Sequence, residues 1–258
     1  MASMLRRLGS WIERHTASAH TAFPKKTRRL QVECLEHRFL LSAYSNLVLQ
    51  DNPIAYWRLG ENGSTTATNE VVAEMADSYK GNPTLGATGL ITADPDKAVR
   101  LDGINDRVAF PDHLAINLRS SYRNKTIELW FKASDVKSRQ VLFEQGGYAN
   151  GLNMYIQDGR LYMGGWNTTA NSRWNTDASS NHGLYLKANI SAGQTYHAVL
   201  VMKGDNDGRA GKLKGYLNGR KFGALTGVGT LPSHDGNASV GALHGTTRFH
   251  DGNAAAKA

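Results

Sequence analysis

The sequence of 258 residues predicts an all-β protein built as an antiparallel β-sandwich, and three observations lead to this fold class. Apolar and polar residues alternate in the segments 126–132, 151–156 and 195–202, a pattern typical of strands with one buried face. Helical periodicity almost disappears after residue 43. Asp-Gly or Asn-Gly pairs, which favour tight hairpin turns because both residues adopt positive φ, occur at 158–159, 207–208, 218–219 and 235–236.

The composition supports a folded β-domain and argues against a nucleic-acid-binding protein. Hydrophobic residues make up 40% of the chain, enough for a core, and 27 glycines suit many turns. The formal net charge is +8, but residues 1–43 carry eight Lys or Arg and three acids, which leaves only +3 for the rest. The basic cluster at 24–29 is not accompanied by an aromatic platform on which successive bases could stack.

The chain has to hold its fold without disulfides and without a membrane span. Cys34 is the single cysteine, so the domain depends on burial, which is sufficient at roughly 200 residues. No apolar run approaches the roughly 20 residues that a transmembrane helix needs.

Residues 1–43 are predicted to be a basic export or sorting leader, disordered or partly a short helix. The apolar stretch before Ser42 and Ala43 covers only residues 39–41, which is too short for an ordinary secretory signal. Residues 35–43 resemble the LEPR-x-LL segment of large exported bacterial proteins, with His37 in place of the usual proline. The alternatives are a disordered basic tail and a membrane-surface helix.

Five motifs in order are similar to those of the bacterial LamG-like jelly-roll domains, within the laminin-G-like, concanavalin A-like superfamily. They lie at 56–59, 77–82, 101–108, 126–131 and 214–220. The resemblance covers about residues 50–250 and implies a concanavalin A-like jelly roll for residues 44–258. Family members end on a further strand, and no part of residues 251–258 resembles it. We therefore expect a domain that lacks its closing C-terminal strand. An unpaired opening strand would then be an exposed sheet edge.

The resemblance also implies a calcium site at Asp77 and Asn82, with loop carbonyls completing it. Calcium takes six to eight oxygen ligands, and the alternative is that both residues only stabilise a turn. The segment 205–208 begins like an EF-hand loop, but Tyr216 stands where a bidentate Glu is required. The histidines form no zinc motif, and His244 and His250 are expected to be structural or solvent-facing.

The acidic residues do not predict an enzyme. Glycoside hydrolysis needs two carboxylates facing one another across the sugar, yet Glu128 and Glu144 have no second acid at the matching spacing on their strands. Ser233 and Asp235 flank His234 in the sequence, whereas the members of a catalytic triad converge from separate segments.

Aromatic residues in the middle of the chain predict a saccharide-binding surface. We place it at Trp166, Asn171 and Trp174, in a long polar segment that also contains Asn167 and Asn175. Tyr155, Tyr162 and Tyr185 lie on nearby strands. The alternative is that these aromatic rings fill the core, as most do in a sandwich.

Together these features predict a non-catalytic, extracellular binding module of a bacterial surface protein, secreted or at the cell surface. Its partner would be a glycan or a surface protein, and calcium is a candidate cofactor. The alternatives are a structural or self-associating module of a surface assembly, and an accessory domain of a carbohydrate-active enzyme.

Overall fold

The computed structural model describes residues 43–75, 77–92, 94–110, 112–117, 120–168, 174, 183–206, 210–233 and 236–256. The chain divides into two units, residues 1–35 and 36–258, and every described residue belongs to the second. The predicted leader and its sorting segment lie outside the described residues, apart from the backbone of Ala43, and they stay predictions.

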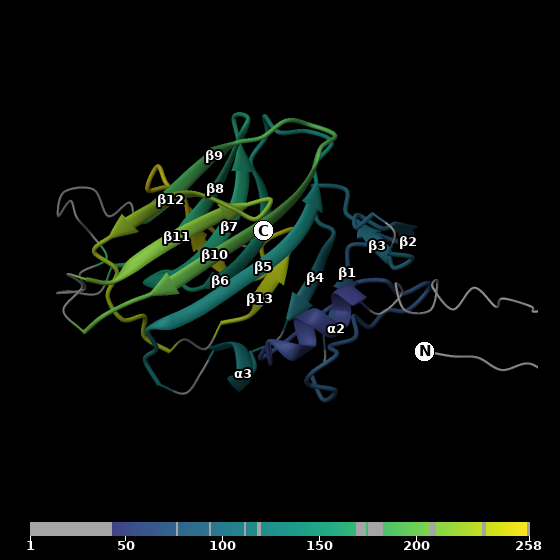
Figure 1. Ribbon diagram of the computed structural model, residues 1–258, viewed down its shortest axis with the longest axis horizontal. Coiled ribbons are helices and arrows are strands. Elements are labelled where there is room, and N and C mark those ends of the chain that lie inside the picture. The colour runs from purple at the N-terminus through teal and green to yellow at the C-terminus, as the bar shows by residue number, and fades with distance from the viewer. Residues whose placement is uncertain are drawn as a thin grey trace, which may run out of the picture. The chain divides into compact units, whose positions relative to one another are not determined.

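The larger sheet has seven antiparallel strands in the order β1-β4-β13-β6-β7-β8-β9 (Figure 1). Strands distant in sequence, such as β4 and β13, are neighbours in it, so the sheet includes crossovers as well as hairpins. Its strands are β1 (Ser78–Lys80), β4 (Arg107–Phe110), β13 (Ala238–Val240), β6 (Gln140–Gly146), β7 (Asn150–Gln157), β8 (Arg160–Asn167) and β9 (Leu184–Asn189).

The second main sheet has four antiparallel strands in the order β12-β11-β10-β5 and packs across the first (Figure 1). Its strands are β5 (Asn124–Lys132), β10 (Thr195–Lys203), β11 (Lys212–Leu217) and β12 (Arg220–Thr226). The small elements are the β2 (Thr84–Thr88) and β3 (Lys97–Arg100) pair, the β14 (Thr246–Arg248) and β15 (Ala254–Ala256) pair, and the helices α2 (Ala43–Gln50) and α3 (Leu114–Asn117). No helix in this part of the chain is long and apolar enough to cross a membrane.

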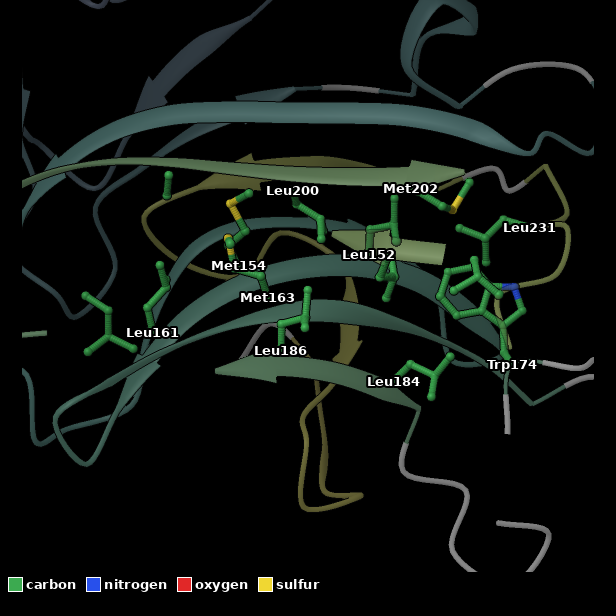
Figure 2. Packing of buried hydrophobic residues seen from close by; sticks show 14 of the residues in the cluster. Leu152, Met154, Leu161, Met163, Trp174, Leu184, Leu186, Leu200, Met202 and Leu231 are labelled. Carbon is green, nitrogen blue, oxygen red and sulfur yellow. The ribbon is translucent and has the colours of Figure 1, made fainter. Parts of the chain in front are cut away.

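The main core fills the space between the two sheets, as Figure 2 shows. Leu152 and Met154 of β7 and Leu161 and Met163 of β8 face the second sheet, where Leu200 of β10 is one of their counterparts. Each such side chain contributes about 1.5–3 kcal/mol when fully buried. These residues occupy alternate positions on their strands, so the predicted antiparallel sandwich is confirmed.

Two of the predicted hairpin turns are confirmed directly. Asp158 and Gly159 join β7 to β8 with φ angles of 51° and 73°, and Asn218 and Gly219 join β11 to β12 with φ angles of 50° and 75°. Positive φ at both central residues is the type I′ geometry that matches the twist of the strands. The pair at 207–208 and residue 235 lie outside the described residues.

Three features of the fold differ from the sequence interpretation or extend it. Residues 43–50 form the helix α2, although helical periodicity is weak there. The segment 56–59 forms no strand, and only a single bridge joins Trp57 to Asn69. Residues 254–256 form β15, which pairs with β14 and not with that opening segment. That a closing strand is missing stays a prediction.

Candidate ligand-binding pocket

The outer face of the seven-stranded sheet carries a cluster of tyrosines on β7, β8 and β9. Because Leu161 and Met163 point into the core, the alternate residues Arg160 and Tyr162 point outward. Tyr162 lies directly opposite Tyr155 on β7. The rings of the two tyrosines stack with centroids 5.1 Å apart and an interplanar angle of 10°.

The C-terminal segment packs onto this tyrosine cluster and forms a second wall. The amide Nδ2 of Asn153 donates hydrogen bonds to Thr247 Oγ1 at 2.8 Å and to the carbonyl of Arg248 at 2.6 Å. The Tyr185 hydroxyl donates to the same carbonyl at 2.5 Å. The next residue, Phe249, is buried with its ring edge-on to Tyr155.

A pocket of about 320 Å³ opens between these two walls. Its volume lies at the lower end of the range for small-molecule sites, roughly 300–1,000 Å³. The described residues that line it are Arg160, Tyr162, Gly183, Tyr185, Lys187 and His250.

The lining carries positive charge and no carboxylate among these residues. Arg160 and Lys187 are exposed, and within the described part of the chain neither has an ion pair or a side-chain hydrogen bond. Asp251 lies next in sequence to His250, but its carboxylate is held by Arg139, 2.5 Å away, and by Asn253. The pocket is therefore electropositive.

His250 is the residue of the C-terminal segment that lines the pocket. The Tyr155 oxygen accepts the backbone N–H of His250 at 2.8 Å and lies 2.6 Å from the ring Nδ1. Desolvation lowers the pKa of His250, which favours the neutral imidazole. The imidazole also stacks on Tyr162, with centroids 3.9 Å apart.

The predicted stacking residues Trp166 and Trp174 are both 0% exposed. Trp166 packs over small residues, because a Cβ on Gly151 would lie 2.5 Å from its indole. Trp174 belongs to the main core and donates from Nε1 to the Thr230 carbonyl at 3.2 Å. A ring that stacks on a sugar needs an exposed face, so this geometry supports the core alternative for both indoles. Asn171 lies outside the described residues.

The two residues predicted to bind calcium are divided between the interior and the surface. Asp77 is buried, its Oδ2 accepts the Trp57 Nε1–H at 2.6 Å, and desolvation raises its pKa. Asn82 is exposed, in a turn with φ of 96°. The strand β1 separates them in the sequence. A calcium site shared by these two residues stays a prediction.

The Asp77 carboxylate has one oxygen that is available to a bound cation. Its Oδ1 is buried without a hydrogen-bond partner among the described residues. The same part of the chain contains no group of three or more His, Cys, Asp or Glu residues that could hold a metal. Asp77 stays a candidate ligand, and the described residues do not supply a carboxylate-rich set around it.

The two acids considered for catalysis lie on different sheets. Glu128 is on the outer face of β5, where its Oε1 is 2.9 Å from His197 Nε2 and accepts from the Tyr44 hydroxyl of α2 at 2.9 Å. Glu144 is buried on β6 opposite Asn153. Neither lines the pocket, so the described residues bring no carboxylate pair together there.

The pocket residues that the sequence interpretation missed are Arg160, Lys187 and His250. The alternation on β8 and β9 places Arg160 beside Tyr162 and Lys187 beside Tyr185. The turn at Asp158 could have fixed the β7–β8 register, but the arrival of His250 depends on tertiary packing.

Comparison with known proteins supports the fold. The family model described as the concanavalin A-like lectin/glucanases superfamily matches residues 102–254. A search of proteins with curated functions found no match.

Three solved structures are similar in fold at low sequence identity. One, for botulinum neurotoxin type C, whose cell entry depends on interaction with two ganglioside molecules, has 13% identity and a TM-score of 0.50, and covers 74% of this chain and 44% of its own. The binding domain of Paraclostridial Mosquitocidal Protein 1 has 14% identity and a TM-score of 0.51, with coverage of 78% and 46%. The receptor binding domain of botulinum neurotoxin D has 12% identity and a TM-score of 0.50, with coverage of 74% and 45%. The chain thus spans less than half the length of each.

Proposed function

The chain belongs to the concanavalin A-like lectin/glucanases superfamily, and on that premise we propose that it is a non-catalytic module that binds an extracellular glycan. The glycan occupies the pocket between β8, β9 and the C-terminal segment. The observation that carries this proposal is the lining itself, which combines the partly exposed ring of Tyr185 with the donors of Arg160 and Lys187, for which the described residues provide no partner. Saccharides are bound by such combinations of apolar ring faces and oriented polar groups.

The chemistry of the pocket favours binding over hydrolysis. Glycoside hydrolases position two carboxylates on either side of the scissile bond. The described lining residues include none, and Glu128 and Glu144 are held elsewhere by their own partners. A saccharide in this pocket would meet hydrogen-bond donors and a tyrosine ring, and no carboxylate among the described lining residues.

The proposed setting is a bacterial surface protein, with this chain secreted or displayed outside the cell. The resemblance of residues 35–43 to a sorting segment supports that location. The fold similarity to toxin binding domains is compatible with an extracellular module, although this chain covers less than half of each of those chains.

Calcium remains a proposed stabilising ligand at Asp77 and has no proposed contact with the pocket. The unpartnered Oδ1 of Asp77 supports it. Titration of the whole chain with Ca²⁺ by calorimetry tests the idea. Binding heat that Asp77→Asn abolishes would support a site, and heat that the variant leaves unchanged would refute this one.

Glycan binding is tested with the full chain on an array of neutral and acidic saccharides. We expect binding to at least one class, weakened by Lys187→Ala, which removes an exposed side chain from the pocket. The matched control is Lys203→Ala, an exposed lysine at the end of β10 on the other sheet. Silence of the array, or equal loss in both variants, would contradict the proposed function.

A further inference from the structure

We infer that the ligand of this pocket is an anionic saccharide, a sugar that carries a carboxylate or a sulfate group. This inference rests on the proposed function and names its substrate class. It is carried by the juxtaposition of Arg160 and Lys187 beside Tyr162.

The polar groups of the lining side chains are mainly donors. A guanidinium has five N–H donors and no acceptor, and an ammonium has three donors and no acceptor. His250 also lines the pocket, and its Nδ1 is 2.6 Å from the Tyr155 oxygen. The tyrosine hydroxyl of Tyr185 is already directed at the Arg248 carbonyl. A ligand must therefore supply acceptors, and an anionic group supplies the strongest ones.

The strand register holds both cations within reach of one anionic group. Lys187 lies directly opposite Tyr162, and Arg160 precedes Tyr162 by two residues on the same face of β8. Residues directly opposite have Cβ atoms about 4.5–5.5 Å apart, and diagonal neighbours lie about 7–8 Å apart. The long Arg160 and Lys187 side chains can close that diagonal separation, so a single carboxylate or sulfate can contact both.

The described residues offset the positive charge of the pocket only in part: Asp158 and Asp251 act electrostatically on His250, but neither is paired with Arg160 or Lys187. Arg58 is paired with Asp96, and Arg139 with Asp251, whereas Arg160 and Lys187 have no acidic partner within that part of the chain. Asp158, in the turn before β8, is not among the lining residues. Two adjacent, unpaired cations repel one another, and an anion that binds between them relieves this repulsion.

The ligand is expected to be a sugar and not simply a polyanion, because charge is only part of the lining. Tyr185 is partly exposed and borders the pocket, where its ring can contact the C–H groups of a sugar. Gly183, at the edge of the pocket, packs closely against β8, since a Cβ there would lie 2.5 Å from the Gly165 carbonyl oxygen. Residues 44–258 carry a net charge of only +3, so no broad field draws in nucleic acid.

Calorimetric titration of the full chain tests this inference with four probes of similar length. Oligogalacturonate offers carboxylates, a heparin oligosaccharide offers sulfates as well, a galactan oligosaccharide is neutral, and polyglutamate is an anion without sugar. We expect one or both acidic sugars to bind. Lys187→Gln and Arg160→Gln should each weaken that binding about tenfold to a hundredfold, as loss of a charge-assisted hydrogen bond does. Preference for heparin over oligogalacturonate identifies sulfate as the recognised group.

The control variant is Arg220→Gln, which removes an exposed arginine on β12 of the other sheet and should leave affinity unchanged. Polyglutamate binding as tightly as the acidic sugars, or no binding of either acidic sugar, overturns the inference. If the galactan oligosaccharide binds in the pocket as well as the acidic sugars do, the inference fails while the proposed function stands. If no saccharide binds at all, the inference and the proposed function both fail.

Discussion

The substitution Glu144→Gln is expected to stabilise the protein at neutral pH. Glu144 is fully buried, and its Oε1 accepts hydrogen bonds from Ser239 Oγ and from the backbone N–H groups of His244 and Gly245, at 2.9–3.1 Å. Its Oε2 is buried without a partner among the described residues, and so is Oδ1 of Asn153, the residue opposite it on β7. A glutamine keeps the accepting oxygen and places an N–H₂ donor beside Asn153.

The magnitude follows from these contacts. An unsatisfied buried acceptor costs about 1–3 kcal/mol, and the new donor removes this cost at one or both atoms. The three hydrogen bonds to Oε1 lose their charge assistance, which offsets part of the gain. Burial nonetheless raises the pKa of Glu144, so the fold favours its neutral form. We expect a net gain of about 1 kcal/mol, or about 2–4 °C in Tm for a domain of this size.

The pH dependence supplies the sharper test. Because the folded-state pKa of Glu144 is raised, the native state holds this proton more tightly than the unfolded chain, and the stability that it contributes is lost as pH rises. Urea unfolding of both proteins at pH 4.5 and pH 7.5 should therefore show a larger gain for Glu144→Gln at pH 7.5. The control Glu128→Gln, at a partly exposed carboxylate whose pKa is lowered by its hydrogen bond with His197, should give no gain. Destabilisation by Glu144→Gln at pH 7.5, or an equal effect at both pH values, would refute the reasoning.

Three further substitutions test the packing and electrostatics of the sandwich. Burial lowers the pKa of Lys125 to about 7, so above that pH the unfolded chain binds more protons than the native state, and the free energy of unfolding should rise from pH 7 towards pH 10. Lys125→Met should flatten that rise in urea titrations, and parallel curves would contradict this. Gly151→Ala, whose Cβ would meet the Trp166 indole at 2.5 Å, should cost about 1–3 kcal/mol, whereas Gly147→Ala, with open space around it, should change Tm little. Trp174→Ala should cost about 3–5 kcal/mol in chemical unfolding because it empties a core position, and a loss of glycan binding without a loss of stability would contradict its core role.

The sequence predicts the hairpins and the alternating strands well because these depend on local chemistry. Asp158 and Gly159 can adopt positive φ, and the alternation on either side fixes which side chains face the core. Helix α2 is less predictable, because its contacts come from the outer face of β5, where Tyr44 meets Trp130 and Glu128.

The candidate site is harder to predict, since its residues converge only in the folded chain. An indole in a polar segment has the same local pattern whether it faces solvent or the core, so Trp166 and Trp174 could not be assigned to the interior from sequence. Lys187 and Arg160 meet through the β8–β9 register, and His250 arrives from a segment about 60 residues further along the chain. None of these contacts leaves a periodic signal.

A crystal structure of the chain with its tightest-binding acidic oligosaccharide tests the central claim most directly. The account predicts a carboxylate or sulfate of the sugar between β8 and β9, with its oxygens about 2.7–2.9 Å from the nitrogens of Arg160 and Lys187 and a sugar ring against Tyr185. An oligosaccharide bound on another surface, with Arg160 and Lys187 making no contact to it, would contradict the account.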